Sequence, residues 1–239
     1  MRSHAALDIA GRIPKFLKIK DLIGKFHSFD SMSVLEVGAG SGVISSYLAN
    51  LVGDNGRVVA VDVVDERIAS DGYVFELVKD AKLPFPSDSF DIIISNHVIE
   101  HVGTSDDQMT HLSEIARVLR KDGIVYLAVP NKYTFIEPHY KLPLLSWLPV
   151  NIASSFVRIT GRGDQYDCNP PPKWLLYNFF ARTGLYADNI TYDAIKIIKR
   201  LEPGGSLMKL VYSLPISFLK PFDLFIPTRT FILSKLKPQ

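Results

Sequence analysis

The sequence predicts a doubly wound α/β fold whose core is a mostly parallel sheet of seven strands. The first observation is a series of short apolar segments bounded by glycine, proline or charged residues, which is typical of strands buried on both faces. The second is that segments with helical periodicity alternate with these strands. Because crossovers between parallel strands are right-handed, helices are expected on both faces of the sheet. The length of 239 residues suits one such domain with an insertion or two.

The elements follow from the apolar pattern, taken in chain order. Strands are expected over residues 33–37, 57–62, 73–78, 90–95, 123–129, 185–192 and 227–234. Helices are expected over residues 13–29, 42–51, 106–120 and 173–182, where apolar residues recur every three or four positions. Prolines and aromatic residues interrupt this rhythm over 131–172, which is too apolar for a linker. We therefore expect a lid insertion after the fifth strand, and a second insertion near 204–222.

Charge and cysteine content restrict the partners and the compartment. The segment from Ala194 to the end has eight basic and two acidic residues, a net charge of +6, so the rest carries −4. A nucleic-acid-binding domain would be basic over a defined face, so no nucleic acid is expected. A basic, apolar tail suits either a peripheral contact with an anionic membrane or an acidic partner. The single cysteine, Cys168, excludes a disulfide framework and a zinc site of the cysteine type, and it indicates a reducing compartment. A cytoplasmic, membrane-associated location is therefore expected.

Two other segments bear on the membrane. Residues 1–10 contain charges and no continuous apolar core, so they are not expected to be a secretory signal. Residues 207–226 are apolar but interrupted by lysines, prolines and an aspartate, and are not expected to span a bilayer.

A glycine-rich loop, Gly38-Ala-Gly-Ser-Gly42, lies between the first strand and the first helix of the sheet. Glycines permit a tight turn and a close approach of the backbone to a ligand, and the helix start offers free N–H groups. A carboxylate or a phosphate would suit that helix start equally. Val43 stands where a dinucleotide-binding loop needs Gly or Ala, and there is no P-loop lysine. Glu36 adds negative charge, which favours a ligand with cationic groups over a pyrophosphate.

Four ordered motifs, at 34–42, 59–62, 79–96 and 114–123, together resemble a class I S-adenosylmethionine (SAM)-dependent methyltransferase of the type-11 kind. The resemblance covers residues 34–131 and implies a Rossmann-like fold, methyltransferase activity and SAM as cofactor. It implies a single methyltransferase domain over 1–239. Its parts would be an N-terminal helical cap (1–30), the SAM-binding core (31–130), the lid insertion (131–172) and the C-terminal part of the core (173–239).

The same resemblance implies which residues bind the cofactor. The glycines of the loop would line the methionine part, Asp62 would accept hydrogen bonds from both ribose hydroxyls, and Asn96 would lie beneath the sulfonium. Val63 would pack on the adenine, with Asp80 at its amino group and Ala81 at the ring edge. The full set is Glu36, Gly38, Gly40, Gly42, Asp62, Val63, Asp80, Ala81 and Asn96. Only about ten residues follow Asp62 before the third strand, so the second helix must be short.

Three histidines are candidate catalytic residues at the carboxyl end of the sheet: His97 and His101 after the fourth strand, and His139 after the fifth. On a helix, His97 and His101 would share a face with Glu100. A general base, a substrate-shaping role and a divalent metal site are the alternatives, the metal being the least favoured. The Glu100-His101 pair resembles the E-x-x-E-H metal motif of ubiquinone-biosynthesis O-methyltransferases and small-RNA 3′-end methyltransferases. Because His97 replaces the first Glu, a softer ion than magnesium would be favoured. The other histidines considered, His4, His27 and His111, are expected at the surface.

The acceptor wall in this fold would come from the N-terminal helix and the lid insertion. Apolar and aromatic side chains occur there at Phe26, Phe29, Tyr133, Phe135, Tyr140, Leu142, Leu144, Leu145, Trp147 and Leu148. They indicate either a packed lid core or an apolar acceptor such as a quinone, a polyprenyl or another lipid-linked molecule. A small acceptor is the other expectation, with O-methylation favoured. The alternative functions are a non-catalytic SAM-binding partner subunit and, more distantly, a nucleotide-dependent oxidoreductase.

Overall fold

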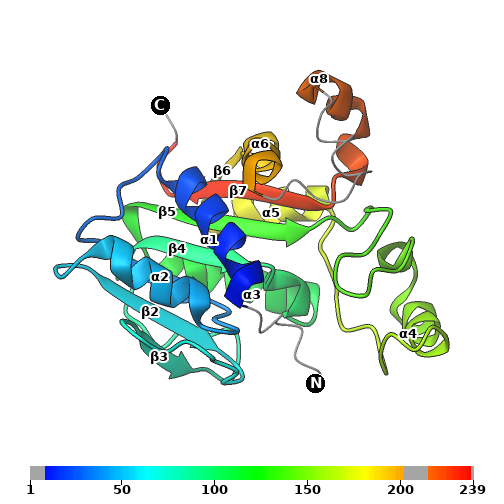
Figure 1. The fold of residues 1–239 in the computed structure, drawn as a ribbon, viewed down its shortest axis with the longest axis horizontal. Helices are drawn as coiled ribbons and strands as arrows, with labels where there is room; N and C mark the ends of the chain where they lie inside the picture. The colour runs from blue at the N-terminus through cyan, green and yellow to red at the C-terminus, as the bar shows by residue number, and fades with distance from the viewer. Residues whose placement is uncertain (1–8, 202–214, 238–239) are drawn as a thin grey trace.

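A computed structural model describes residues 9–201 and 215–237, and its centre is the expected seven-stranded sheet (Figure 1). The strands are β1 (Ser33–Val37), β2 (Arg57–Asp62), β3 (Val74–Leu77), β4 (Phe90–Asn96), β5 (Leu119–Pro130), β6 (Tyr186–Asn189) and β7 (Thr228–Ser234). Their order is β3-β2-β1-β4-β5-β7-β6, and only β7 runs antiparallel to its neighbours. This order changes direction beside β1, which is where open α/β sheets bind their ligands.

Helices cover both faces of the sheet, as predicted. One face packs against α1 (Ile9–Ile23), α2 (Val43–Val52) and α6 (Thr191–Leu201), and the other against α3 (Ser105–Val118) and α5 (Lys173–Thr183). Helix α3 begins at a capping box in which Thr104 and Asp107 bond to each other's backbone amides. The inner strands β1, β2, β4, β5 and β7 are largely buried, which explains their apolar sequences, whereas the edge strands β3 and β6 are partly exposed.

Three local expectations are wrong. The sixth strand ends at Asn189, and the residues after Ile190 form α6, whose buried Ala194 and Ile197 have helical spacing. Residues 63–73 form no helix between β2 and β3, although a short one was expected. The first helix covers 9–23 rather than 13–29, because the chain turns after Gly24.

The insertion after β5 has a small core of its own. It contains the 3-10 helix η2 (Leu145–Trp147) and α4 (Val150–Ile159). Its buried side chains come from both of its ends and from α4: Tyr140, Leu142, Leu145, Ala153, Val157, Tyr166 and Cys168. Part of the expected acceptor wall is therefore core packing. Beyond it, Phe135 and Trp147 stay exposed and contact Phe225.

The C-terminal segment that meets this insertion is described from residue 215 onward. It forms α8 (Ile216–Leu219) and the 3-10 helix η3 (Lys220–Phe225) before β7. The expected second insertion near 204–222 lies partly outside the described residues, as do most of the N-terminal residues 1–10 and part of 207–226. Among the helices of the described ranges, none has both the length and the apolar character to cross a membrane.

Candidate active site

The glycine loop connects β1 to α2 and is shaped by left-handed backbone at three positions. Gly38, Gly40 and Gly42 have φ angles of 82°, 50° and 74°. A Cβ atom on Gly42 would lie 2.1 Å from the carbonyl oxygen of Ala69 and 2.2 Å from the hydroxyl of Tyr73. The loop 63–73 therefore closes against the glycine loop only because Gly42 has no side chain.

Replacing Gly42 with alanine is expected to destabilise the fold by about 3 kcal/mol or more, since steric overlap adds to the cost of left-handed backbone. The matched control is Gly161→Ala, at a φ of 67° with open space around the new Cβ. It should cost only about 1–2 kcal/mol. Urea unfolding of both variants measures the difference, and equal losses would mean that the contact with Ala69 and Tyr73 does not matter.

Asp62 ends β2 beside the glycine loop and holds the loop in place through a hydrogen bond. Its Oδ2 accepts a hydrogen bond from the amide of Gly40 at 2.8 Å, and its Oδ1 accepts one from Val63 at 2.7 Å. A carboxylate has about four acceptor sites, so two remain for ligand hydroxyls. Asp62 is only half-buried, which leaves these sites accessible.

Glu36 is fully buried on β1, two residues before the glycine loop. Burial is the main influence on its carboxyl group and raises the pKa of Glu36 to about 8. A hydrogen bond from the Ser45 hydroxyl and the positive charge of Arg12 oppose this shift, whereas Asp62 adds to it. Arg12 lies on α1, and sequence reasoning missed it because only packing brings α1 over the start of the loop.

The raised pKa of Glu36 makes stability depend on pH, and Glu36→Gln is expected to remove that dependence. Between pH 4.5 and about 8 the folded state keeps the proton of Glu36, whereas the unfolded state releases it. The free energy of unfolding therefore falls as pH rises through this window, by on the order of a few kcal/mol. Glutamine still offers an oxygen to Ser45. Urea unfolding of both proteins across the window is the measurement, and parallel profiles would contradict the assignment.

The remaining predicted cofactor residues lie at the ends of neighbouring strands. Val63 is 52% exposed immediately after β2. Asp80 is exposed after β3 and accepts a hydrogen bond from the amide of Lys82, and Ala81 beside it is half-buried. Asn96 ends β4, and its buried Oδ1 has no hydrogen-bond partner among the described residues. An unpaired buried acceptor is costly in a folded protein, so this atom points to a ligand.

The predicted histidines meet, but not in the predicted way. His97 has left-handed backbone (φ 59°), and only a single 3-10 turn, η1 (Ile99–His101), follows it. The expectation that His97 and His101 share a helical face is therefore wrong. Instead His139, from the insertion, contacts both, with ring centroids 6.0 Å from His97 and 5.2 Å from His101.

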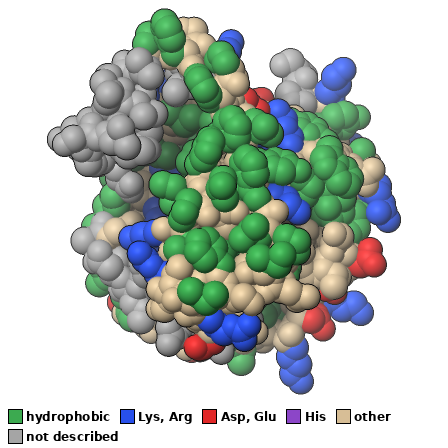
Figure 2. Space-filling view, turned by 90° about the vertical axis from the view of Figure 1, so that its right-hand side faces the viewer, with side chains coloured by type: hydrophobic (Ala, Val, Ile, Leu, Met, Phe, Trp, Pro, Cys, Tyr) green, Lys and Arg blue, Asp and Glu red, His purple; other side chains and the backbone are tan. Residues whose placement is uncertain are grey.

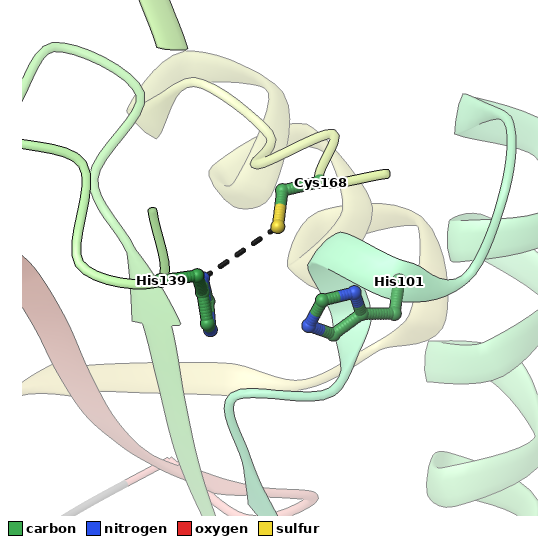
Figure 3. Close-up of side chains that lie close together, drawn as sticks. All are labelled: His101, His139 and Cys168. Atoms are coloured by element: carbon green, nitrogen blue, oxygen red, sulfur yellow. Dashed lines mark hydrogen bonds between the residues drawn. The ribbon is translucent and has the colours of Figure 1, made fainter. Parts of the chain in front are cut away.

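Glu100 is fully buried behind these histidines. Its Oε1 lies 3.4 Å from Nδ1 of His97 and 3.8 Å from Nε2 of His139. Neither of its carboxylate oxygens has a hydrogen-bond partner of good geometry in the described ranges. His139 also contacts Glu137, whose Oε1 lies 3.0 Å from Nδ1 of the ring. Cys168 lies beside the same imidazole (Figure 3). Sequence reasoning singled out neither Glu137 nor Cys168 for this site, because loop packing alone brings them here.

His111 is a further correction, since it was expected at the surface. It is buried on α3, and its Nε2 lies 3.4 Å from the hydroxyl of Ser95. Burial lowers the pKa of His111 to about 4, so the imidazole is neutral. The helical spacing of Leu112 and Ile115 beside it could have indicated that this face is turned inward.

A doubly wound sheet with a glycine loop after β1 and a carboxylate at the end of β2 defines a nucleotide-cofactor-binding domain. Residues 35–127 match the family model described as a methyltransferase domain. A probable S-adenosylmethionine-dependent methyltransferase of Mycolicibacterium smegmatis is 34% identical over 124 residues, covering 49% of this chain and 45% of that protein. The ubiquinone biosynthesis O-methyltransferase of Bartonella tribocorum is 26% identical over 133 residues, 51% of each chain. The chain thus spans about half the length of these relatives.

Solved structures share the fold over most of the chain. The YcgJ protein of Bacillus subtilis superposes with a TM-score of 0.51 at 17% identity, covering 92% of this chain and 99% of that one. A SAM-dependent methyltransferase of Aquifex aeolicus gives 0.50 at 18% identity, covering 71% and 80%. Residues 35–127 are therefore a methyltransferase domain of the class I, SAM-dependent type, and SAM is its cofactor. Free acceptor sites on Asp62, the unpaired Oδ1 of Asn96 and the buried acid Glu36 fit that cofactor.

Proposed function

We propose that the protein transfers a methyl group from SAM to an oxygen atom of an apolar, lipid-linked acceptor that it meets at a membrane surface. The observation that carries this proposal is the exposed apolar face of the insertion, beside the histidines at the carboxyl end of the sheet. The relatives include an O-methyltransferase of ubiquinone biosynthesis, and this supports an acceptor with an apolar chain. The fold alone does not identify the acceptor.

The cofactor would be held by the nine residues around the glycine loop and the strand ends. Asp62 would accept hydrogen bonds from the ribose, and Asn96 would offer its unpaired oxygen near the sulfonium. Glu36 keeps its proton near neutral pH, and a cationic amino group bound beside it would favour release of that proton. Val63, Asp80 and Ala81 would bound the adenine. When bound, SAM supplies an electrophilic methyl group.

His97 is the general base in this proposal. Its Nδ1 faces Glu100, which leaves Nε2 free to take the proton from an acceptor hydroxyl as the new bond forms. The buried carboxylate of Glu100 would orient the ring and stabilise the imidazolium, as in other histidine–carboxylate pairs. The side chain of His97 is 25% exposed, so an acceptor can reach it.

We define the insertion face as the exposed apolar side chains of the insertion and of the C-terminal segment beside it. They are Phe135, Ile136, Leu144, Trp147, Val150, Ile152, Ile159, Phe218, Phe222 and Leu224. Figure 2 shows hydrophobic side chains gathered on the side of the molecule that carries α4 and α8. Exposed Lys141, Arg158, Arg162 and Lys220 belong to the same segments. Large apolar patches flanked by cations suit an anionic lipid surface.

The acceptor class is tested with two phenols of matched chemistry, catechol and a prenylated catechol in vesicles, using SAM with a labelled methyl group. Labelling mainly of the prenylated compound is expected. If catechol alone is labelled, methyl transfer stands and the lipid-linked acceptor is wrong. If SAM binds and neither is labelled, the result favours a non-catalytic SAM-binding subunit. Binding of NAD without SAM would favour an oxidoreductase instead.

The membrane contact makes a separate prediction. A double variant with Ile152 and Ile159 of α4 changed to aspartate should bind phosphatidylglycerol vesicles more weakly than the wild type. The expected loss is about tenfold or more for each residue, since each loses the burial of a large apolar side chain in the lipid. The control is Leu77→Asp, an equally exposed apolar residue on the edge strand β3. Vesicle sedimentation measures binding, and equal binding of all three proteins would contradict the assigned surface.

A further inference from the structure

His101, His139 and Cys168 converge from three separate segments of the chain (Figure 3). His101 ends η1, His139 lies in the loop after β5, and Cys168 lies just before α5. One ligand atom of each lies within 4.8 Å of the others. The Sγ of Cys168 forms a 3.5 Å hydrogen bond with Nδ1 of His139, a nitrogen that also contacts Glu137. Zinc bond lengths and tetrahedral angles place a sulfur and a nitrogen ligand about 3.6 Å apart, so this edge already has the separation of a metal site.

Hydrogen bonds hold the cysteine segment in this position. The amide of Asn169, next to Cys168, donates to the carbonyl of Glu100 at 2.7 Å. The side-chain amide of Gln108 donates to the carbonyls of both Ile99 and Asn169. The backbone segments that carry Cys168 and His101 are thus held together before any ligand binds, which is a property of sites that bind metals.

The surroundings of these three residues are rich in buried negative charge. Glu100 and Glu137 are almost completely buried. In the described part of the chain, the ion pairs of both glutamates are formed with histidines. A metal ion that bound the Cys168 thiol would displace its proton. A divalent cation would also balance the carboxylates.

We propose that His101, His139 and Cys168 bind one zinc-class divalent ion, which fastens the insertion to η1. Two imidazoles and a thiolate select zinc over magnesium, because sulfur is a soft ligand. Three protein ligands leave one tetrahedral position open. On binding, the Cys168 thiol loses one proton to solvent and its sulfur takes the metal, with no change of oxidation state. This site adds to the proposed function and does not depend on it.

The test loads the untagged full-length protein with zinc or with cobalt, removes unbound metal and measures the metal content. We expect one equivalent per chain, and a near-ultraviolet thiolate-to-cobalt absorption band. Cys168→Ala should lose the band and weaken metal binding about tenfold or more. The matched control is His27→Gln, a half-buried histidine outside the metal-ligand groups of the described residues, which should change neither readout. SAM binding by calorimetry shows that each variant is folded, and His101→Gln replaces Cys168→Ala if that variant fails to fold.

Two outcomes would overturn the proposal. The first is a wild-type protein that retains neither zinc nor cobalt. The second is stoichiometric metal in Cys168→Ala together with no thiolate band in the wild type, which would remove Cys168 from the ligand set. Both readouts need neither acceptor nor methyl transfer, so they fail or succeed independently of the proposed activity.

Discussion

His97→Gln is expected to lower kcat by about 100- to 10,000-fold, the range for loss of a general base, while the Kd for SAM stays the same. Glutamine fills similar space but cannot take a proton. His97 lies at the end of β4 with Nδ1 toward Glu100, so only the proton-accepting role is removed. The assay uses the better of the two catechol acceptors, with SAM affinity measured separately by calorimetry.

Two comparisons make this result specific. Glu100→Gln keeps the shape of the partner and should lower kcat less than His97→Gln does, because a neutral amide still orients the ring but stabilises the imidazolium poorly. His27→Gln should change nothing. If His97→Gln keeps wild-type kcat, the histidine only shapes the pocket, and the proton leaves by another route.

Asp62→Ala should weaken SAM binding by at least about 30-fold, since each hydrogen bond to a charged acceptor is worth about 1.5–3 kcal/mol. The variant also loses the hydrogen bonds that the amides of Gly40 and Val63 donate to Asp62, so the glycine loop is no longer bonded to the end of β2. Calorimetry with SAM measures the change. The control is Asp65→Ala, the same residue type three positions on, which is exposed and paired with Arg67. Equal affinities for Asp62→Ala and wild type would refute the ribose assignment.

The sheet could be predicted from the sequence because each buried strand is apolar along its whole length. The segments before Gly38, Asp62 and Asn96 all form strands close to the expected bounds. Their polar end residues then meet at one edge by topology alone. The predicted end of the sixth strand was wrong because α6 begins directly after Asn189. No glycine or proline separates the two elements in the sequence.

The histidine cluster could be predicted only in part. His97, His101 and His139 were expected at the same edge because all three follow the carboxyl ends of predicted strands. Their contacts depend on the conformation of the loops, which the sequence pattern does not determine. Cys168 lies 29 residues after His139 in the sequence, and the packing of the insertion core brings it to the cluster. A lone cysteine has no sequence pattern that would predict such a distant contact.

The hydrogen bonds of Gln108 and Asn169 have a consequence for how an acceptor enters. They fix the C-terminal end of the insertion to η1, and its N-terminal end continues directly from β5. The insertion therefore cannot swing aside as a rigid flap about a single hinge. Any opening must come from the middle, where α4 and its exposed Ile152 and Ile159 lie. With the membrane contact proposed above, the entry route would face the bilayer, and an acceptor would pass from lipid to the histidines without crossing water.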